Sequence, residues 1–75
     1  MEASELIKAI RSQLGVSQEA FAEAIHVAFA TVNRWENNKS TPNRMAKALI
    51  TDYCIKKGID KKLIDAIQEI RGGGE

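Results

Sequence analysis

The apolar residues of this chain recur at helical spacing, and no long alternation of apolar and polar residues predicts a β-strand. The first apolar stripe, with members at i, i+1, i+4 and i+8, consists of Leu6, Ile7, Ile10 and Leu14. Ser4 is a suitable N-cap for this first helix, and Gly15 is a suitable terminator. Ser17 can cap a second helix, whose apolar side is formed by Ala20, Phe21, Ala24 and Ile25.

Two further helices are predicted on either side of a polar loop. The third helix covers residues 28–37, and its apolar side is formed by Val32 and Trp35. The loop follows at 37–42, where a run of polar residues precedes the only proline of the chain. The fourth helix ends at Gly58, and its broad apolar face comprises Met45, Ala46, Leu49, Ile50 and Tyr53.

A fifth helix is predicted after its N-cap Asp60, and its apolar face is formed by Leu63, Ile67 and Ile70. The glycines at 72–74 abolish helical propensity, so residues 72–75 are expected to form a flexible tail after a single domain at 1–71. Five short helices with short links predict a compact all-α domain rather than an elongated bundle.

The link between the second and third helices is the most informative connection. Only His26 and Val27 lie between Ile25 and Ala28, so the two helices must meet at a steep angle, as in a helix-turn-helix unit. Such turns often need one residue with a positive φ, and His26 belongs to the residue types that tolerate this conformation. We therefore expect His26 to be a turn residue without a catalytic or ligand role.

Composition excludes several classes of function. The 75 residues (8.3 kDa) amount to one domain with little room for a catalytic cleft and its supporting residues. One cysteine, Cys54, and one histidine allow neither an internal disulfide nor a two-histidine metal motif. We therefore predict no catalytic residue, no metal and no cofactor. No apolar run approaches the ~20 residues of a membrane helix and no signal peptide opens the sequence, so a cytoplasmic protein without a membrane partner is expected.

The net charge of +1 is unevenly distributed along the chain. Residues 1–30 hold two basic and four acidic side chains, residues 31–47 hold four basic and one acidic, and residues 48–75 hold five of each. The positive charge is thus concentrated in the central segment. Such a segment suits a polyanion binder, although an ordinary solvated surface would have the same charge.

The outer face of the third predicted helix has an unusual composition for a solvent-exposed surface, with Phe29, Ala30, Asn33, Arg34 and Asn37. Asparagine can pair with adenine through two hydrogen bonds, arginine can bind guanine or phosphate, and phenylalanine or alanine can contact the thymine methyl group. A helix with these side chains fits the major groove of B-DNA. The residues alone leave a DNA partner, a protein partner and inward packing of Phe29 open.

Several segments together match one pattern: Ile10 to Glu19 (IRSQLGVSQE), Ala22, Ala30 to Asn37 (ATVNRWEN), Lys39 and Pro42. By their order and spacing, residues 4–50 resemble the lambda-repressor/Cro-like, or XRE-type, helix-turn-helix domain. A short element such as LGVSQ is weak evidence for the family when taken alone, but the whole set of segments is specific for it. The resemblance implies a five-helix domain that binds double-stranded DNA with its third helix. Because the sequence has no nucleophile–base pair, metal cluster or phosphate loop, we expect a non-enzymatic protein without a small-molecule substrate.

The resemblance also implies roles for individual residues. Base contacts fall on Phe29, Ala30, Asn33 and Arg34. Phosphate contacts fall on Gln18, Asn37, Asn38 and Lys39, to which the basic segment adds Arg44. Gln18 is further expected to brace the first recognition residue. Arg11 and Glu36 are expected to form a structural ion pair between the first and third helices, the alternative being two unrelated surface charges.

Three positions depart from the family pattern. The family usually has glycine where this chain has His26, and serine or threonine where it has Ala28. Ala28 has no side-chain oxygen to cap the third helix, a loss of about 0.5–2 kcal/mol relative to serine. Asn38 replaces another common glycine, and asparagine tolerates the left-handed conformation.

The function expected from the sequence is sequence-specific binding of double-stranded DNA by a transcriptional regulator or a DNA-targeting module, in a prokaryotic or phage setting close to the nucleoid. The alternative is a protein-interaction module that keeps the fold without binding DNA. A weak homodimer through the fifth helix is also expected, because Ile64 lies at the margin of its apolar face. In the competing arrangement Ile64 packs on the fourth helix and the domain is a monomer.

Overall fold

The computed structural model describes residues 2–70. These residues form five α-helices without a β-strand: α1 (Ala3–Leu14), α2 (Gln18–Ala24), α3 (Phe29–Glu36), α4 (Arg44–Lys57) and α5 (Lys61–Glu69). The prediction of an all-α domain with five helices is therefore confirmed. The predicted tail at 72–75 lies outside the described residues.

Most helix ends follow from local sequence. Ser17, Asn43 and Asp60 each accept a hydrogen bond from a backbone N–H in the first turn of the next helix, at 2.9–3.0 Å. Gly15 and Gly58 end α1 and α4 with φ angles of 72° and 70°, a conformation that glycine adopts without strain. The predicted caps of α2 and α5 and both glycine terminators are thus confirmed.

The start of α1 differs from the prediction. Glu2 is the N-cap, and it forms a capping box with Glu5, whose Oε1 accepts a hydrogen bond from the Glu2 N–H at 3.2 Å. Ser4 lies within the first turn and is buried. The prediction that Ser4 caps this helix was wrong, because the N-cap lies two residues earlier, at Glu2, where the capping box with Glu5 forms.

One side of every helix contributes to a single hydrophobic core. Its buried members are Leu6, Ile7, Ile10, Phe21, Ala22, Ile25, Val32, Trp35, Ala46, Ile50, Cys54, Ile59 and Ile67. Cys54 is a core residue, and burial raises the pKa of its thiol to about 11. Ile59, in the link between α4 and α5, was not predicted to be buried.

The predicted apolar faces of two helices were too broad. In α4 the buried stripe follows Ala46, Ile50 and Cys54 at spacings of four, whereas Met45 is 74% exposed. In α2, Phe21 faces the core and Ala20 is exposed. A helical wheel ranks positions by angle, but the width of the buried stripe depends on how closely the neighbouring helices approach.

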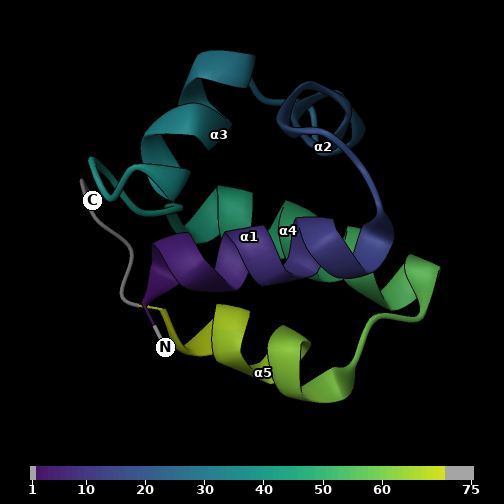
Figure 1. Cartoon of the computed structure of the whole chain (residues 1–75). Helices are drawn as coiled ribbons and strands as arrows, with labels where there is room; N and C mark the ends of the chain where they lie inside the picture. The colour runs from purple at the N-terminus through teal and green to yellow at the C-terminus, as the bar shows by residue number, and fades with distance from the viewer. Residues whose placement is uncertain (1, 71–75) are drawn as a thin grey trace.

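The helices are arranged so that α2 and α3 lie at one end of the molecule and α5 at the other (Figure 1). Helix α1 contacts both α3 and α5, α2 packs against α3, and α4 packs against α5. The helix-turn-helix pair therefore lies on a base formed by α1, α4 and α5. Within residues 2–70 no helix is long and apolar enough to cross a bilayer.

Candidate nucleic-acid interface

The turn between α2 and α3 is built on a left-handed residue. His26 has a φ of 64°, as predicted, and its N–H donates to the Glu23 carbonyl at 3.2 Å. The N–H of Val27 donates to the Ala22 carbonyl at 3.0 Å, which completes the end of α2. This left-handed residue ends α2 and lets α3 begin only a few residues later at a new angle.

Helix α3 begins without a side-chain cap. Ala28 occupies the N-cap position with φ −72° and ψ 148°, and no side-chain hydrogen bond is formed there. Its carbonyl accepts hydrogen bonds from the N–H groups of Thr31 and Val32 at 3.0 and 3.4 Å. The first turn of α3 thus depends on backbone groups alone, as the sequence predicted.

The two sides of α3 differ sharply in burial. Val32, Trp35 and Glu36 are buried. On the opposite side Ala30 and Arg34 are exposed, and Phe29 keeps 51% of its surface accessible, so Phe29 does not pack inward. Asn33 is partly buried at the boundary between the two sides. Three of the four residues expected to contact bases therefore face solvent, and Asn33 lies beside them.

An ion pair joins α1 to the end of α3. Arg11 Nε donates to Glu36 Oε2 at 2.6 Å, and Arg11 Nη2 donates to Glu36 Oε1 at 3.0 Å. A third bond from Arg11 Nη1 to the Val16 carbonyl, at 3.0 Å, fixes the guanidinium against the α1–α2 link. The Arg11–Glu36 pair expected from the resemblance is therefore present, with two parallel hydrogen bonds.

The environment of this pair shifts both pKa values toward the charged forms. Burial alone would raise the pKa of the Glu36 carboxyl, whose side chain is 3% exposed. Hydrogen bonds from Arg11 and Gln18, together with the charge of Arg11, outweigh burial and lower that pKa. The hydrogen bond to Glu36 raises the pKa of Arg11. Glu36 is therefore an ionised, almost fully buried acceptor.

A chain of side-chain amides extends from Glu36 to the outer face of α3. Gln18 Nε2 donates to Glu36 Oε1 at 2.9 Å, and Gln18 Oε1 accepts from Asn33 Nδ2 at 3.1 Å. Asn33 Oδ1 in turn accepts from Asn37 Nδ2 at 2.9 Å. We call this connected set, Arg11, Glu36, Gln18, Asn33 and Asn37, the amide relay.

The hydrogen bond from Gln18 to α3 is not at the first recognition residue, as expected, but at Asn33. The Gln18 oxygen accepts from the Asn33 amide, in the second turn of α3. The Asn33–Asn37 bond was not anticipated, although the i, i+4 spacing of two amides on a helix would have indicated it. The bond from Gln18 to Glu36 has no such local signal, because 18 residues separate them and the α2–α3 angle brings them together.

The loop after α3 presents the other residues expected to contact phosphate. Asn38 adopts a φ of 60°, and the Lys39 N–H donates to the Arg34 carbonyl at 2.9 Å, so the loop turns tightly at the end of the helix. The side chains of Asn37, Asn38, Lys39 and Arg44 are exposed. Lys47 of the same basic segment instead donates to the Ile70 carbonyl and joins α4 to the end of α5.

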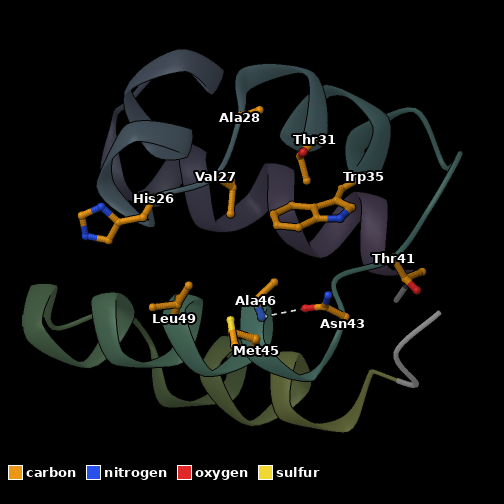
Figure 2. A pocket seen from close by; sticks show the side chains of 10 residues that line it. All are labelled: His26, Val27, Ala28, Thr31, Trp35, Thr41, Asn43, Met45, Ala46 and Leu49. Atoms are coloured by element: carbon orange, nitrogen blue, oxygen red, sulfur yellow. Dashed lines mark hydrogen bonds between the residues drawn. The ribbon is translucent and has the colours of Figure 1, made fainter. Parts of the chain in front are cut away.

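A groove of about 350 Å³ separates the α2–α3 turn from the first half of α4 (Figure 2). Trp35 faces α4 across this groove, and Asn43 at its edge is held by its cap bond to the Ala46 N–H. His26 is the only titratable residue in the lining. No group of three or more His, Cys, Asp or Glu side chains in residues 2–70 is placed to hold a metal ion.

The fold and this surface define a helix-turn-helix domain, with α2 and α3 as the paired helices. A family model described as helix-turn-helix matches residues 7–49, more than half of the chain. The chain belongs to this XRE/lambda-repressor-like helix-turn-helix family, which implies DNA binding by a domain of a typically non-enzymatic class. Comparisons with curated proteins and with solved structures gave no match.

Proposed function

We propose that this protein binds double-stranded DNA in a sequence-specific manner, with α3 in the major groove, as a transcriptional regulator or a DNA-targeting module at prokaryotic or phage DNA. The observation that carries the proposal is the outer face of α3. It combines an exposed apolar side chain, Phe29, with the guanidinium of Arg34 and the partly exposed amide of Asn33. Apolar, amide and guanidinium groups are the ones that recognise thymine methyl, adenine and guanine in the major groove.

The proposed phosphate contacts flank this face. Asn37, Asn38 and Lys39 extend the end of α3, and Arg44 opens α4 nearby in the chain. On the α2 side, Gln18 donates one N–H to Glu36 and keeps a second N–H that could donate to a phosphate oxygen. Contacts of this kind position a protein on the duplex, while the α3 side chains would carry the base preference.

The test compares two alanine variants in a binding assay. A fluorescent duplex selected from a randomised library is titrated with protein at several salt concentrations, and anisotropy reports the affinity. Asn33→Ala should cost about 1–3 kcal/mol on the selected duplex and relax the preference at one base pair. Lys39→Ala should weaken all duplexes alike and reduce the salt slope by about one.

Lys61→Ala is the matched control, because it removes one exposed cation from α5 at the opposite end of the molecule. It should leave both the affinity and the salt slope unchanged. No binding of any duplex at low salt would contradict the proposal. It would favour the alternative of a protein-interaction module, which the exposed Phe29 and the net charge of +1 also suit.

A weak homodimer through α5 is part of the proposal. Ile64 is only partly buried against the core, so one edge of its side chain is accessible to a second copy. Ile64→Lys should abolish cooperative binding to a palindromic site while half-site affinity and the melting temperature stay unchanged. If the variant unfolds instead, Ile64 is a core residue and the domain is a monomer.

A further inference from the structure

The hydrogen bonds of the amide relay have a fixed direction, and Glu36 sets that direction. The ionised carboxylate of Glu36 can only accept hydrogen bonds, so Gln18 must turn its NH₂ group toward it. The Gln18 oxygen then points to Asn33, which must donate through Nδ2. The Asn33 oxygen is consequently on the side of Asn37, whose Nδ2 donates to it.

The direction of the relay determines what Asn33 presents to a partner. An asparagine amide has two N–H donors and an oxygen with two lone pairs. One donor is used by Gln18 and one lone pair by Asn37, which leaves one N–H and one lone pair. The donor lies toward the α2 side of the surface and the acceptor toward the end of α3. The two cannot exchange while Glu36 remains an obligate acceptor.

Adenine presents an acceptor, N7, beside a donor, the N6 amino group, in the major groove. Replacing an A·T pair by T·A puts the thymine methyl group and the O4 acceptor where N7 and N6 were. An amide locked to donate to N7 and accept from N6 then faces O4 with its own oxygen, whereas an amide that can rotate by 180° can donate to O4. The lock therefore distinguishes the two orientations of one base pair.

We propose that Glu36 is a specificity-determining positioning residue: through Gln18 it fixes the Asn33 amide and so selects one orientation of an A·T base pair. This inference rests on the proposed function. Glu36 itself touches no base, since its side chain is 3% exposed. An amide at position 36 could donate to the Gln18 oxygen, which would allow Gln18 and Asn33 both to turn over.

The test uses two variants that interrupt the relay at different points. Glu36→Gln keeps an oxygen that can accept from Arg11 but removes the obligate acceptor. Gln18→Met keeps the Arg11–Glu36 pair, and hence the tie between α1 and α3, while it removes the amide that connects Glu36 to Asn33. Glu23→Gln is the matched control, because it makes the same change of charge at an exposed position of α2.

The measurement compares each protein on the duplex selected by the wild type and on the same duplex with the Asn33-dependent base pair reversed. The wild type should discriminate between them by about 5- to 150-fold, the range for one pair of base hydrogen bonds. Both relay variants should discriminate at least about fivefold less than the wild type, with unchanged discrimination at the other base pairs. Glu23→Gln should discriminate as the wild type does.

A readout without DNA is the NMR spectrum of the side-chain amides. The Asn33 NH₂ resonances should shift in Glu36→Gln and Gln18→Met and stay in place in Glu23→Gln. Unshifted resonances in both relay variants overturn the inference. So does a Glu36→Gln protein that loses affinity equally for all base pairs and keeps the wild-type discrimination at the Asn33-dependent base pair. In Gln18→Met some uniform loss of affinity is expected, because the proposed phosphate contact of Gln18 is removed as well.

The two proposals fail in different ways. If the wild-type protein selects no duplex sequence, both the proposed function and the positioning role of Glu36 are overturned. Suppose instead that the wild type selects a sequence and Asn33→Ala loses the preference at one base pair. If Glu36→Gln and Gln18→Met then keep that preference, the positioning role is overturned and the proposed function stands.

Discussion

The missing cap of α3 leads to a prediction of increased stability. Ala28 already has the extended backbone of an N-cap, with φ −72° and ψ 148°. Ser17, the N-cap of α2, has nearly the same backbone, with φ −77° and ψ 169°, and its hydroxyl accepts from the Ala20 N–H at 3.0 Å. In Ala28→Ser the corresponding donor is the N–H of Thr31, three residues further on. The substitution should therefore supply a cap without moving the backbone.

The size of the effect follows from the bonds already present. A serine cap is worth about 0.5–2 kcal/mol relative to alanine. Because the Thr31 N–H already donates to the Ala28 carbonyl at 3.0 Å, we expect the lower half of that range, about 0.5–1 kcal/mol. A domain of this size gains about 4–8 °C in melting temperature per kcal/mol, so the rise should be about 2–8 °C.

Thermal and urea unfolding followed by circular dichroism measure this change. Ala48→Ser is the matched control, since it places the same hydroxyl at an exposed position inside α4, where serine costs up to about 0.7 kcal/mol of helix propensity. Ala28→Ser should raise the urea midpoint at an unchanged m-value, and Ala48→Ser should lower it. Equal effects of the two substitutions, or no gain at position 28, would refute the capping argument.

Three other predictions concern the core and the ion pair. Trp35 is 3% exposed, so Trp35→Ala should lower the free energy of unfolding by about 3–5 kcal/mol, when a domain of this size has about 4–11 kcal/mol in all. A urea midpoint near the wild-type value would contradict the core position of Trp35. The lowered pKa of Glu36 means that its contribution to stability is complete above the unfolded pKa of about 4.3 and is lost as pH falls through the lower folded value. The melting temperature of the wild type should thus fall more steeply below pH 4 than that of Glu36→Gln, and parallel curves would contradict this. Cys54 is buried with a pKa of about 11, so at pH 8 its thiol should react with iodoacetamide at least about 100-fold more slowly in the native than in the unfolded protein. Mass spectrometry measures the two rates, and equal rates would contradict this prediction.

Local signals predicted the fold well because they act within one turn of a helix. The caps Ser17 and Asp60 and the terminators Gly15 and Gly58 all function through backbone groups two to four residues away. The start of α1 was misplaced for a related reason. Two cap patterns overlap in its first residues, and the Glu2–Glu5 box prevails over Ser4.

The site was only partly predictable from the sequence. The outer face of α3 follows from helical spacing, and the resemblance indicated the Arg11–Glu36 pair across 25 residues of chain. The contacts of Gln18 could not be predicted, because they depend on the angle between α2 and α3. That angle decides whether the Gln18 amide meets Asn33 or the start of the helix.

In the proposed complex with DNA, the amide relay would separate two contributions to recognition that the sequence mixes in one short segment. The exposed cations Lys39 and Arg44 would act through phosphate charge, which salt screens and which depends little on orientation. Glu36 would act instead from a site that solvent hardly reaches, where its carboxylate is held by Arg11 and is weakly screened. A small domain has few rigid supports to offer a base-reading side chain, because its core is thin. Connecting Asn33 to the ion pair that already joins α1 to α3 gives that side chain the rigidity of the whole helical cluster.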